Sequence, residues 1–89
     1  MDLNLIETIA DGLERFIRER FSVPETDTQF SQQVNLWEEG YVDSLGAVEL
    51  IAFIESTYTI KLPTSVLFAP DFTTIGGMAR LTGQLVAQR

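Results

Sequence analysis

Residues 38–55 read EEGYVDSLGAVELIAFIE, and this stretch carries the strongest structural signal in the chain. Its first third is a polar turn, and the remainder predicts a helix over residues 44–58 that begins behind Asp43, a good N-cap residue. At about 100° per residue, one sector of this helix is apolar and is expected to face the core: Ala47, Leu50, Ile51, Ile54 and Tyr58. A second row lies on roughly the opposite side: Leu45, Val48, Ala52 and Glu55.

A first helix is predicted upstream of this stretch. Apolar residues recur at three- and four-residue steps from Leu5 to Ile17 and predict a helix over residues 3–20. Asp2 or Asn4 can cap its start, and Pro24 prevents it from continuing much further.

Two shorter elements are predicted downstream. The segment between Pro63 and Pro70 fits a short helical turn, with Val66, Leu67 and Phe68 as its apolar part. A last helix is expected over residues 75–87, capped by Thr73 or Thr74 and weakened by its three glycines. Its inward stripe is predicted to be Ile75, Met78, Leu81 and Leu85.

Residues 22–42 lack both helical and strand periodicity. A loop of this length in a small domain is usually functional or tied down by its own side chains, and Leu36, Trp37 and Phe30 are the expected anchors. The predicted fold is therefore all-α, a small four-helix bundle of three main helices and one short helix with a long first loop. We expect residues 1–89 to form one domain.

The charge balance is acidic and uneven. There are 13 acidic and 6 basic residues, a net charge of −7, and no basic residue falls between Arg20 and Lys61. Such a surface repels nucleic acid and anionic membranes and suits a basic protein partner, although net charge also simply keeps a small protein soluble. No apolar run reaches the roughly 18 residues of a membrane span, and the N-terminus lacks the basic start of a secretory signal. We expect a cytoplasmic monomer that binds neither nucleic acid nor membrane.

Composition also argues against an enzyme. The chain has no cysteine and no histidine, which removes thiolate chemistry and the usual general base. Ser44 therefore lacks the base that a hydrolytic serine needs, and Lys61, the only lysine, lies beyond the same helix. No metal site is expected, because Asp27 lacks the ligand spacing of a calcium loop and a surface acidic cluster is more often simply solvated: Glu38, Glu39 and Asp43.

The segment GYVDSLGAVELIAFIE resembles the attachment motif of acyl and peptidyl carrier proteins, in which D-S-L heads a helix and V-E-L follows. The resemblance covers nearly the whole chain, since the LW pair at 36–37, the IKLP segment at 60–63 and PDFTTI at 70–75 also suit that family. Gly46 departs from the fatty-acid type, which has a further acid after D-S-L. The G-G-H-S or G-G-D-S of carriers embedded in large synthetases is also absent. The combination is more similar to discrete carriers of specialised pathways, including those loaded with an amino acid by a separate ligase.

The resemblance implies a role for Ser44. A transferase using coenzyme A would place 4′-phosphopantetheine on the Ser44 hydroxyl, with Asp43 as motif residue and helix cap, and the arm would carry an acyl or aminoacyl group as a thioester. A helix N-terminus favours the phosphodiester that results. The implied partners are a phosphopantetheinyl transferase, an acyl- or aminoacyl-loading ligase and downstream enzymes of a nonribosomal peptide or polyketide-type pathway. Taken alone, Asp43-Ser44 also fits a plain helix cap.

The resemblance also implies a docking surface, because the second helix is the main docking surface of such carriers. The expected partner-binding residues are Leu45, Val48, Glu49, Ala52 and Glu55. Two alternatives stay open. Val48 fits equally a core position in so small a bundle, and the whole chain fits an unmodified helical interaction module that docks through the Leu45/Val48 face.

Overall fold

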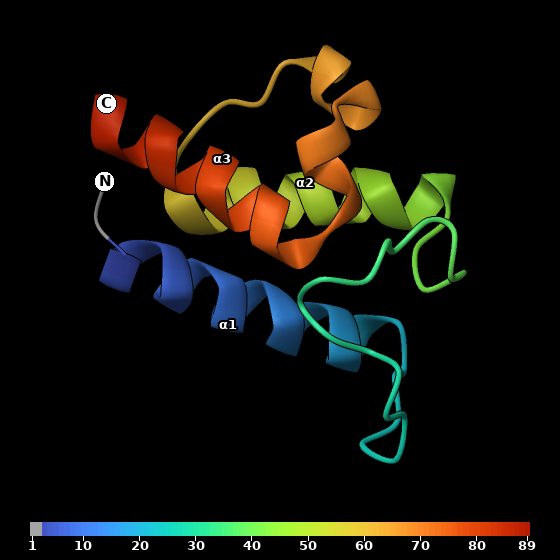
Figure 1. The fold of residues 1–89 in the computed structure, drawn as a ribbon. Helices are drawn as coiled ribbons and strands as arrows, with labels where there is room; N and C mark the ends of the chain where they lie inside the picture. The colour runs from blue at the N-terminus through green and yellow to red at the C-terminus, as the bar shows by residue number, and fades with distance from the viewer. Residues whose placement is uncertain (1–2) are drawn as a thin grey trace.

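The computed structural model describes residues 3–89, and every regular element in that range is helical (Figure 1). Three α-helices are joined through a long loop and two consecutive 3₁₀ turns: α1 Leu3–Arg20, α2 Ser44–Tyr58, η1 Thr64–Phe68, η2 Pro70–Thr73 and α3 Ile75–Gln88. The all-α prediction and the bounds of the first two helices are confirmed. The predicted short helix takes the form of the two 3₁₀ turns.

Neither of the two residues predicted to cap α1 is seen in that role. Asp2 lies outside the described residues, and Asn4 lies inside α1, where its carbonyl accepts a hydrogen bond from Thr8 Oγ1 at 2.8 Å. Within residues 3–89, no helix combines the length and the hydrophobicity that a membrane crossing requires.

One hydrophobic core unites the elements. Leu13 and Ile17 of α1, Leu50 and Ile54 of α2 and Leu36 of the loop are all fully buried. The core face predicted for α2 is therefore confirmed at its centre, while Ile51 and Tyr58 at its sides are only partly buried. Phe30 and Leu36 anchor the loop in the core, as predicted.

The two interfaces of α1 differ in spacing. Towards α3 the helices approach closely, because a Cβ added at Gly83 would lie only 3.3 Å from Ile6 Cγ1. Towards α2 they are separated by aromatic rings, with Phe16 stacked on Phe53 at 4.2 Å between centroids. Small residues on α3 and large ones between α1 and α2 thus set two different helix separations.

The inward stripe of α3 differs from the one predicted. Ile75 and Met78 are buried as expected, whereas Leu81 and Leu85 are only partly buried. The other buried residues of α3 have small side chains: Ala79, Thr82 and Gly83, of which Gly83 faces Ile6 of α1, and Gly77, which faces Asp71 of η2. Hydrophobicity alone favoured the leucines, but close approach to α1 selects for small residues.

The start of α3 depends on a steric contact. Thr74 Oγ1 caps the helix by accepting the Gly77 N–H at 2.9 Å, which confirms one of the two predicted caps. A Cβ placed on Gly77 would overlap the carbonyl oxygen of Asp71 in η2. Glycine at this position therefore lets η2 fold back directly onto the first turn of α3.

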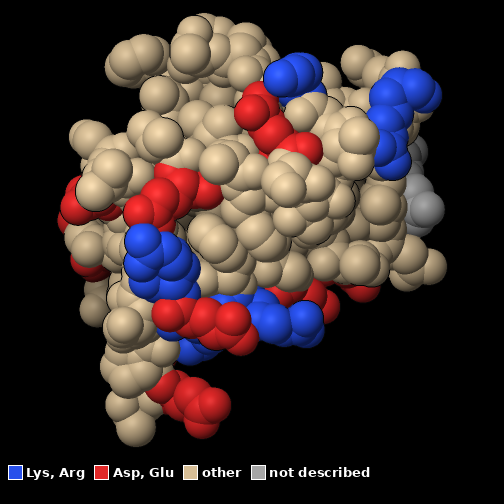
Figure 2. All heavy atoms as spheres, turned by 180° about the vertical axis from the view of Figure 1, so that it is seen from behind, with Lys and Arg blue, Asp and Glu red and all other residues tan. Residues whose placement is uncertain are grey.

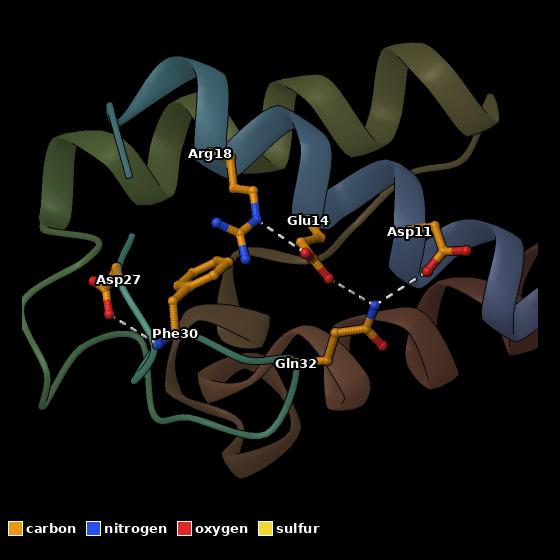
Figure 3. Close-up of polar contacts among 6 residues, drawn as sticks. All are labelled: Asp11, Glu14, Arg18, Asp27, Phe30 and Gln32. Carbon is orange, nitrogen blue, oxygen red and sulfur yellow. Dashed lines mark hydrogen bonds and ion pairs between the residues drawn. The ribbon is translucent and has the colours of Figure 1, made fainter. Parts of the chain in front are cut away.

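The long loop is tied to α1 by side chains, as Figure 3 shows. Gln32 Nε2 donates to Asp11 Oδ1 at 3.1 Å and to Glu14 Oε1 at 3.0 Å, while Arg18 Nε donates to Glu14 Oε2 at 2.9 Å. The Arg18 guanidinium also lies 4.6 Å from the centre of the Phe30 ring, a cation–π contact. The hydrogen bond from Gln32, then that from Arg18, lowers the pKa of Glu14.

Asp27 organises the outer part of the loop. Its Oδ1 accepts the N–H groups of Gln29 at 2.9 Å and Phe30 at 3.1 Å, and its Oδ2 accepts the Tyr41 hydroxyl at 2.8 Å. The Tyr41 hydrogen bond is the main cause that lowers the pKa of Asp27. The loop is therefore tied down by its own side chains, which fits the sequence expectation.

The adjacent glycines of α3 give a matched test of the η2 contact. Gly77→Ala should lower the free energy of unfolding by about 2–3 kcal/mol, because the new methyl group meets a backbone carbonyl. Gly76→Ala should raise it by about 0.5–1 kcal/mol, since its nearest neighbour, Gln32 O, would be an ordinary 3.5 Å away. Urea melts measure both variants. A Gly77→Ala protein as stable as the wild type would refute the contact.

A second prediction concerns acid stability. The pKa of Asp27 is lower in the folded state, so its contribution is present above the unfolded pKa of about 4 and is lost as the pH falls through the folded value. Between pH 5 and pH 3 the wild type should lose more stability than Tyr41→Phe, which lacks the main hydrogen bond to Asp27. Urea melts at both pH values give the comparison. Equal losses in the two proteins would contradict the role of Tyr41.

Candidate functional site

The head of α2 places a serine hydroxyl at the surface. Asp43 is extended, at φ −105° and ψ −174°, and its Oδ1 accepts the Gly46 N–H at 2.8 Å. This hydrogen bond confirms the predicted N-cap. Ser44 is the first helical residue and is exposed to solvent. The cap therefore comes from Asp43, which leaves the Ser44 hydroxyl free of that structural duty.

A glycine is needed at position 46 for a steric reason that the sequence did not reveal. It is buried, and a Cβ there would lie 2.8 Å from Cε1 and 3.0 Å from Cζ of Phe21. The Phe21 ring, which follows α1 directly, thus packs against the first turn of α2. An acidic side chain at position 46, as in the fatty-acid type of carrier, would displace this ring.

The LW pair joins the loop to the segment before α3. Leu36 N–H donates to Thr73 O at 2.8 Å, and Trp37 Nε1 donates to Phe72 O at 3.2 Å. Asn35 Oδ1 accepts the Trp37 N–H at 3.0 Å and so orients the start of this turn. Trp37 is therefore held by both its backbone and its indole nitrogen, a few residues before Ser44.

An open groove lies beside Ser44. It has a volume of about 390 Å³, and its walls come from α2, the loop and the two 3₁₀ turns. Most of the lining is apolar, and the residues besides Ser44 include Ala47, Trp37, Leu67, Phe68 and Pro70. Sequence reasoning missed this groove, because periodicity says nothing about how the 3₁₀ turns return to the head of α2.

Phe68, one of the three apolar residues of the short turn, lies at the surface. It is 88% exposed. Val66 alone is buried there, and Leu67 is partly buried. The tight 3₁₀ turn directs one apolar side chain inward, so Phe68 is left at the rim of the groove.

The predicted second row on α2 lies on the surface. Leu45 is 70% exposed and Val48 is 59% exposed, and Ala52 is exposed as well. The alternative that Val48 belongs to the core is therefore wrong. Figure 2 shows the molecule from behind the view of Figure 1, and charged groups there surround a broad area that carries none.

The two acidic residues predicted for partner binding are engaged within the molecule. Arg20 Nη2 donates to Glu49 Oε1 at 2.7 Å, and Arg20 Nε forms an ion pair with Oε2, also at 2.7 Å. Glu55 Oε2 accepts the Leu62 N–H at 2.8 Å, which secures the chain after α2. Glu49 is therefore paired with a cation within the molecule, whereas Glu55 accepts a backbone N–H and keeps its negative charge.

Acidic residues near the site do not converge. Within residues 3–89, no group of three or more acidic side chains is arranged to hold a metal ion. Glu38 N–H donates to Asn35 Oδ1 at 3.0 Å, and Glu39 Oε1 accepts a hydrogen bond from Gln29 Nε2 at 2.6 Å. Glu39 therefore takes part in the loop through its side chain, and Glu38 takes part through its backbone.

Comparison with known proteins agrees with this geometry. Residues 12–82 match the family model described as "Phosphopantetheine attachment site". The chain is 33% identical over 73 residues to the D-alanyl carrier proteins of Streptococcus pyogenes serotype M5 (strain Manfredo), serotype M49 (strain NZ131) and serotype M1. Each match covers 82% of this chain and 84% of the relative.

A match over most of the chain establishes the family. Proteins of this family carry intermediates on phosphopantetheine, are modified by a phosphopantetheinyl transferase and are loaded by ligases, and they are not themselves catalysts. An exposed serine at a capped helix start, beside an open groove, fits such a covalent group. The chain therefore belongs to the family of phosphopantetheine-binding carrier proteins.

Proposed function

We propose that this chain is a free-standing aminoacyl or acyl carrier protein whose arm is attached to Ser44. The observation that carries the proposal is the position of Ser44 at the first residue of α2, exposed and directly behind the Asp43 cap. Ser22, Ser56 and Ser65 are also exposed, but none of them begins an α-helix. Exposure alone does not distinguish these serines, whereas a helix N-terminus favours a phosphodiester.

In this proposal the chain positions the Ser44 hydroxyl, and the transferase supplies the catalytic groups. Ser44 Oγ would form a bond to the phosphorus of coenzyme A next to the pantetheine, the bond to the second phosphate would break, and adenosine bisphosphate would leave. The hydroxyl proton would pass to the transferase, because this chain contains no histidine to accept it. Once attached, the arm supplies a thiol for a thioester, which the cysteine-free chain does not encode.

The relatives favour a small amino acid as the cargo, since they are D-alanyl carrier proteins. We propose a separate ligase as the loading enzyme and one carrier domain over residues 1–89, acting as a monomer in the cytoplasm. Delivery to a nonribosomal peptide or polyketide-type pathway remains part of the proposal. The exposed row of Leu45, Val48 and Ala52 would be the docking surface, with Glu55 contributing negative charge to its edge and Glu49 joining it through its ion pair with Arg20.

The attachment residue is tested by mass spectrometry. After incubation with coenzyme A and a broad-specificity phosphopantetheinyl transferase, the wild type and Ser65→Ala should each gain one arm, and Ser44→Ala should gain none. Ser44→Ala should keep its stability within about 0.5 kcal/mol, since Asp43 still caps α2. An arm on Ser44→Ala would refute the assignment, and a wild type that takes none would favour an unmodified interaction module.

The docking surface is tested by the rate of that same transfer. Val48→Glu and Gln84→Glu each add one negative charge at an exposed helical position, so both should stay folded. Val48→Glu should slow the transfer about tenfold, because burying the new carboxylate against an apolar partner surface costs free energy. Gln84→Glu should leave the rate unchanged. Circular dichroism melts accompany the rates. Equal rates for both variants would leave the Leu45/Val48 row without a role in docking.

A further inference from the structure

One ion pair joins the end of α1 to the second turn of α2. Arg20 is the last residue of α1, and its Nη2 donates to Glu49 Oε1 while its Nε lies 2.7 Å from Oε2. Two nitrogens of one guanidinium thus face both oxygens of one carboxylate, an arrangement that is stronger than a single contact. Within residues 3–89 it is the only ion pair that connects two helices, since the other lies inside α1.

The packing after Arg20 positions it for this contact. Phe21 follows directly, and its ring packs so closely on Gly46 that an added Cβ there would lie 2.8 Å from Cε1. The same ring meets Phe16 edge-on at 6.2 Å between centroids. Because residue 21 is held against the first turn of α2, the backbone at residue 20 is held there too. Little backbone freedom is therefore lost when the ion pair forms.

Glu49 lies at the edge of the exposed row on α2. It comes one helical turn after Leu45, which places the two side chains next to each other on the helix surface. It also lies five residues after Ser44, about 7–8 Å along the helix axis. Glu55 is farther from Ser44, and it accepts the Leu62 N–H and keeps its charge. Of the two acids beside the row, the one nearer the attachment residue is thus the one paired with a cation.

We propose that Arg20 determines which partners this carrier accepts, by holding the Glu49 carboxylate that a basic docking partner would otherwise bind. The inference rests on the proposed function, in which partners dock on the exposed row of α2. A partner with an arginine or lysine opposite Glu49 must displace Arg20 before it gains an ion pair. A partner with an apolar contact surface meets no such competition. The carrier therefore favours partners that dock by apolar contact at this end of α2.

The exposure of the pair sets the size of the effect. The Arg20 and Glu49 side chains are 55% and 29% exposed, and pairs of this kind are usually worth a factor of roughly two to five in an equilibrium constant. Removal of Arg20 should therefore change the rate of docking severalfold and leave the protein folded. Added salt should reduce the change, because it screens the freed carboxylate.

The rate of arm transfer to Ser44 measures the competition. The probe is a broad-specificity phosphopantetheinyl transferase chosen for a basic docking surface, and intact mass gives kcat/KM. Arg20→Gln should raise kcat/KM about threefold at about 20 mM salt, and the gain should shrink at about 300 mM salt. Arg20→Lys, which keeps a cation beside Glu49, should stay close to the wild type at both salt concentrations.

Two controls separate the ion pair from the net charge. Arg80→Gln removes the same charge from an exposed residue of α3 that forms no ion pair within residues 3–89. It should leave kcat/KM within about 1.5-fold of the wild type. The double variant Arg20→Gln/Glu49→Gln should return to the wild-type value, because the freed carboxylate is gone. Circular dichroism melts show whether each variant is folded.

The outcomes separate this inference from the proposed function. A gain in Arg20→Gln that is absent from Arg80→Gln and disappears in the double variant supports the role of Arg20. Equal rates for Arg20→Gln and the wild type, a gain that survives in the double variant, or an equal gain in Arg80→Gln overturns the inference alone. An unfolded Arg20→Gln would assign the pair to stability and would overturn it as well. A wild type that takes no arm overturns the proposed function and this inference with it.

Discussion

Two hydrogen bonds hold the segment before α2 to the segment before α3, and the site depends on them. Leu36 N–H donates to Thr73 O at 2.8 Å, and the Trp37 indole donates to Phe72 O at 3.2 Å. The first joins residues that are 37 positions apart in the chain, and the second joins residues that are 35 apart. The contact of η2 with Gly77 and the buried Val66 and Phe72 hold the 3₁₀ turns to the core, and this junction ties them to the loop that leads into Ser44.

Two further contacts, at the starts of α2 and α3, support that junction. Phe21 packs over Gly46 at the first turn of α2, and η2 folds onto Gly77 at the first turn of α3. Both glycines serve close contact at a helix start. These contacts fix how the first turns of α2 and α3 pack, and Ser44, the attachment residue that we propose, begins α2.

Much of the fold followed from local patterns. Apolar spacing predicted α1, α2 and the core positions Leu50 and Ile54, and Asp43 was recognised as a cap because its short side chain suits that role. The features that were missed depend on contacts between distant segments. The exposure of Phe68, the engagement of Glu49 by Arg20 and the groove beside Ser44 all arise from tertiary packing, which periodicity does not encode.

Native-state amide hydrogen exchange tests the junction most directly. The Leu36 amide should exchange at a rate within about tenfold of that of the Met78 amide in α3. If the junction is stable, the hydrogen bonds of both amides break only when the core opens. The Thr28 amide, in the exposed part of the same loop, should exchange far faster. A Leu36 amide that exchanges as fast as Thr28 would show that the loop is not held at Thr73, and would contradict the account of how Ser44 is placed.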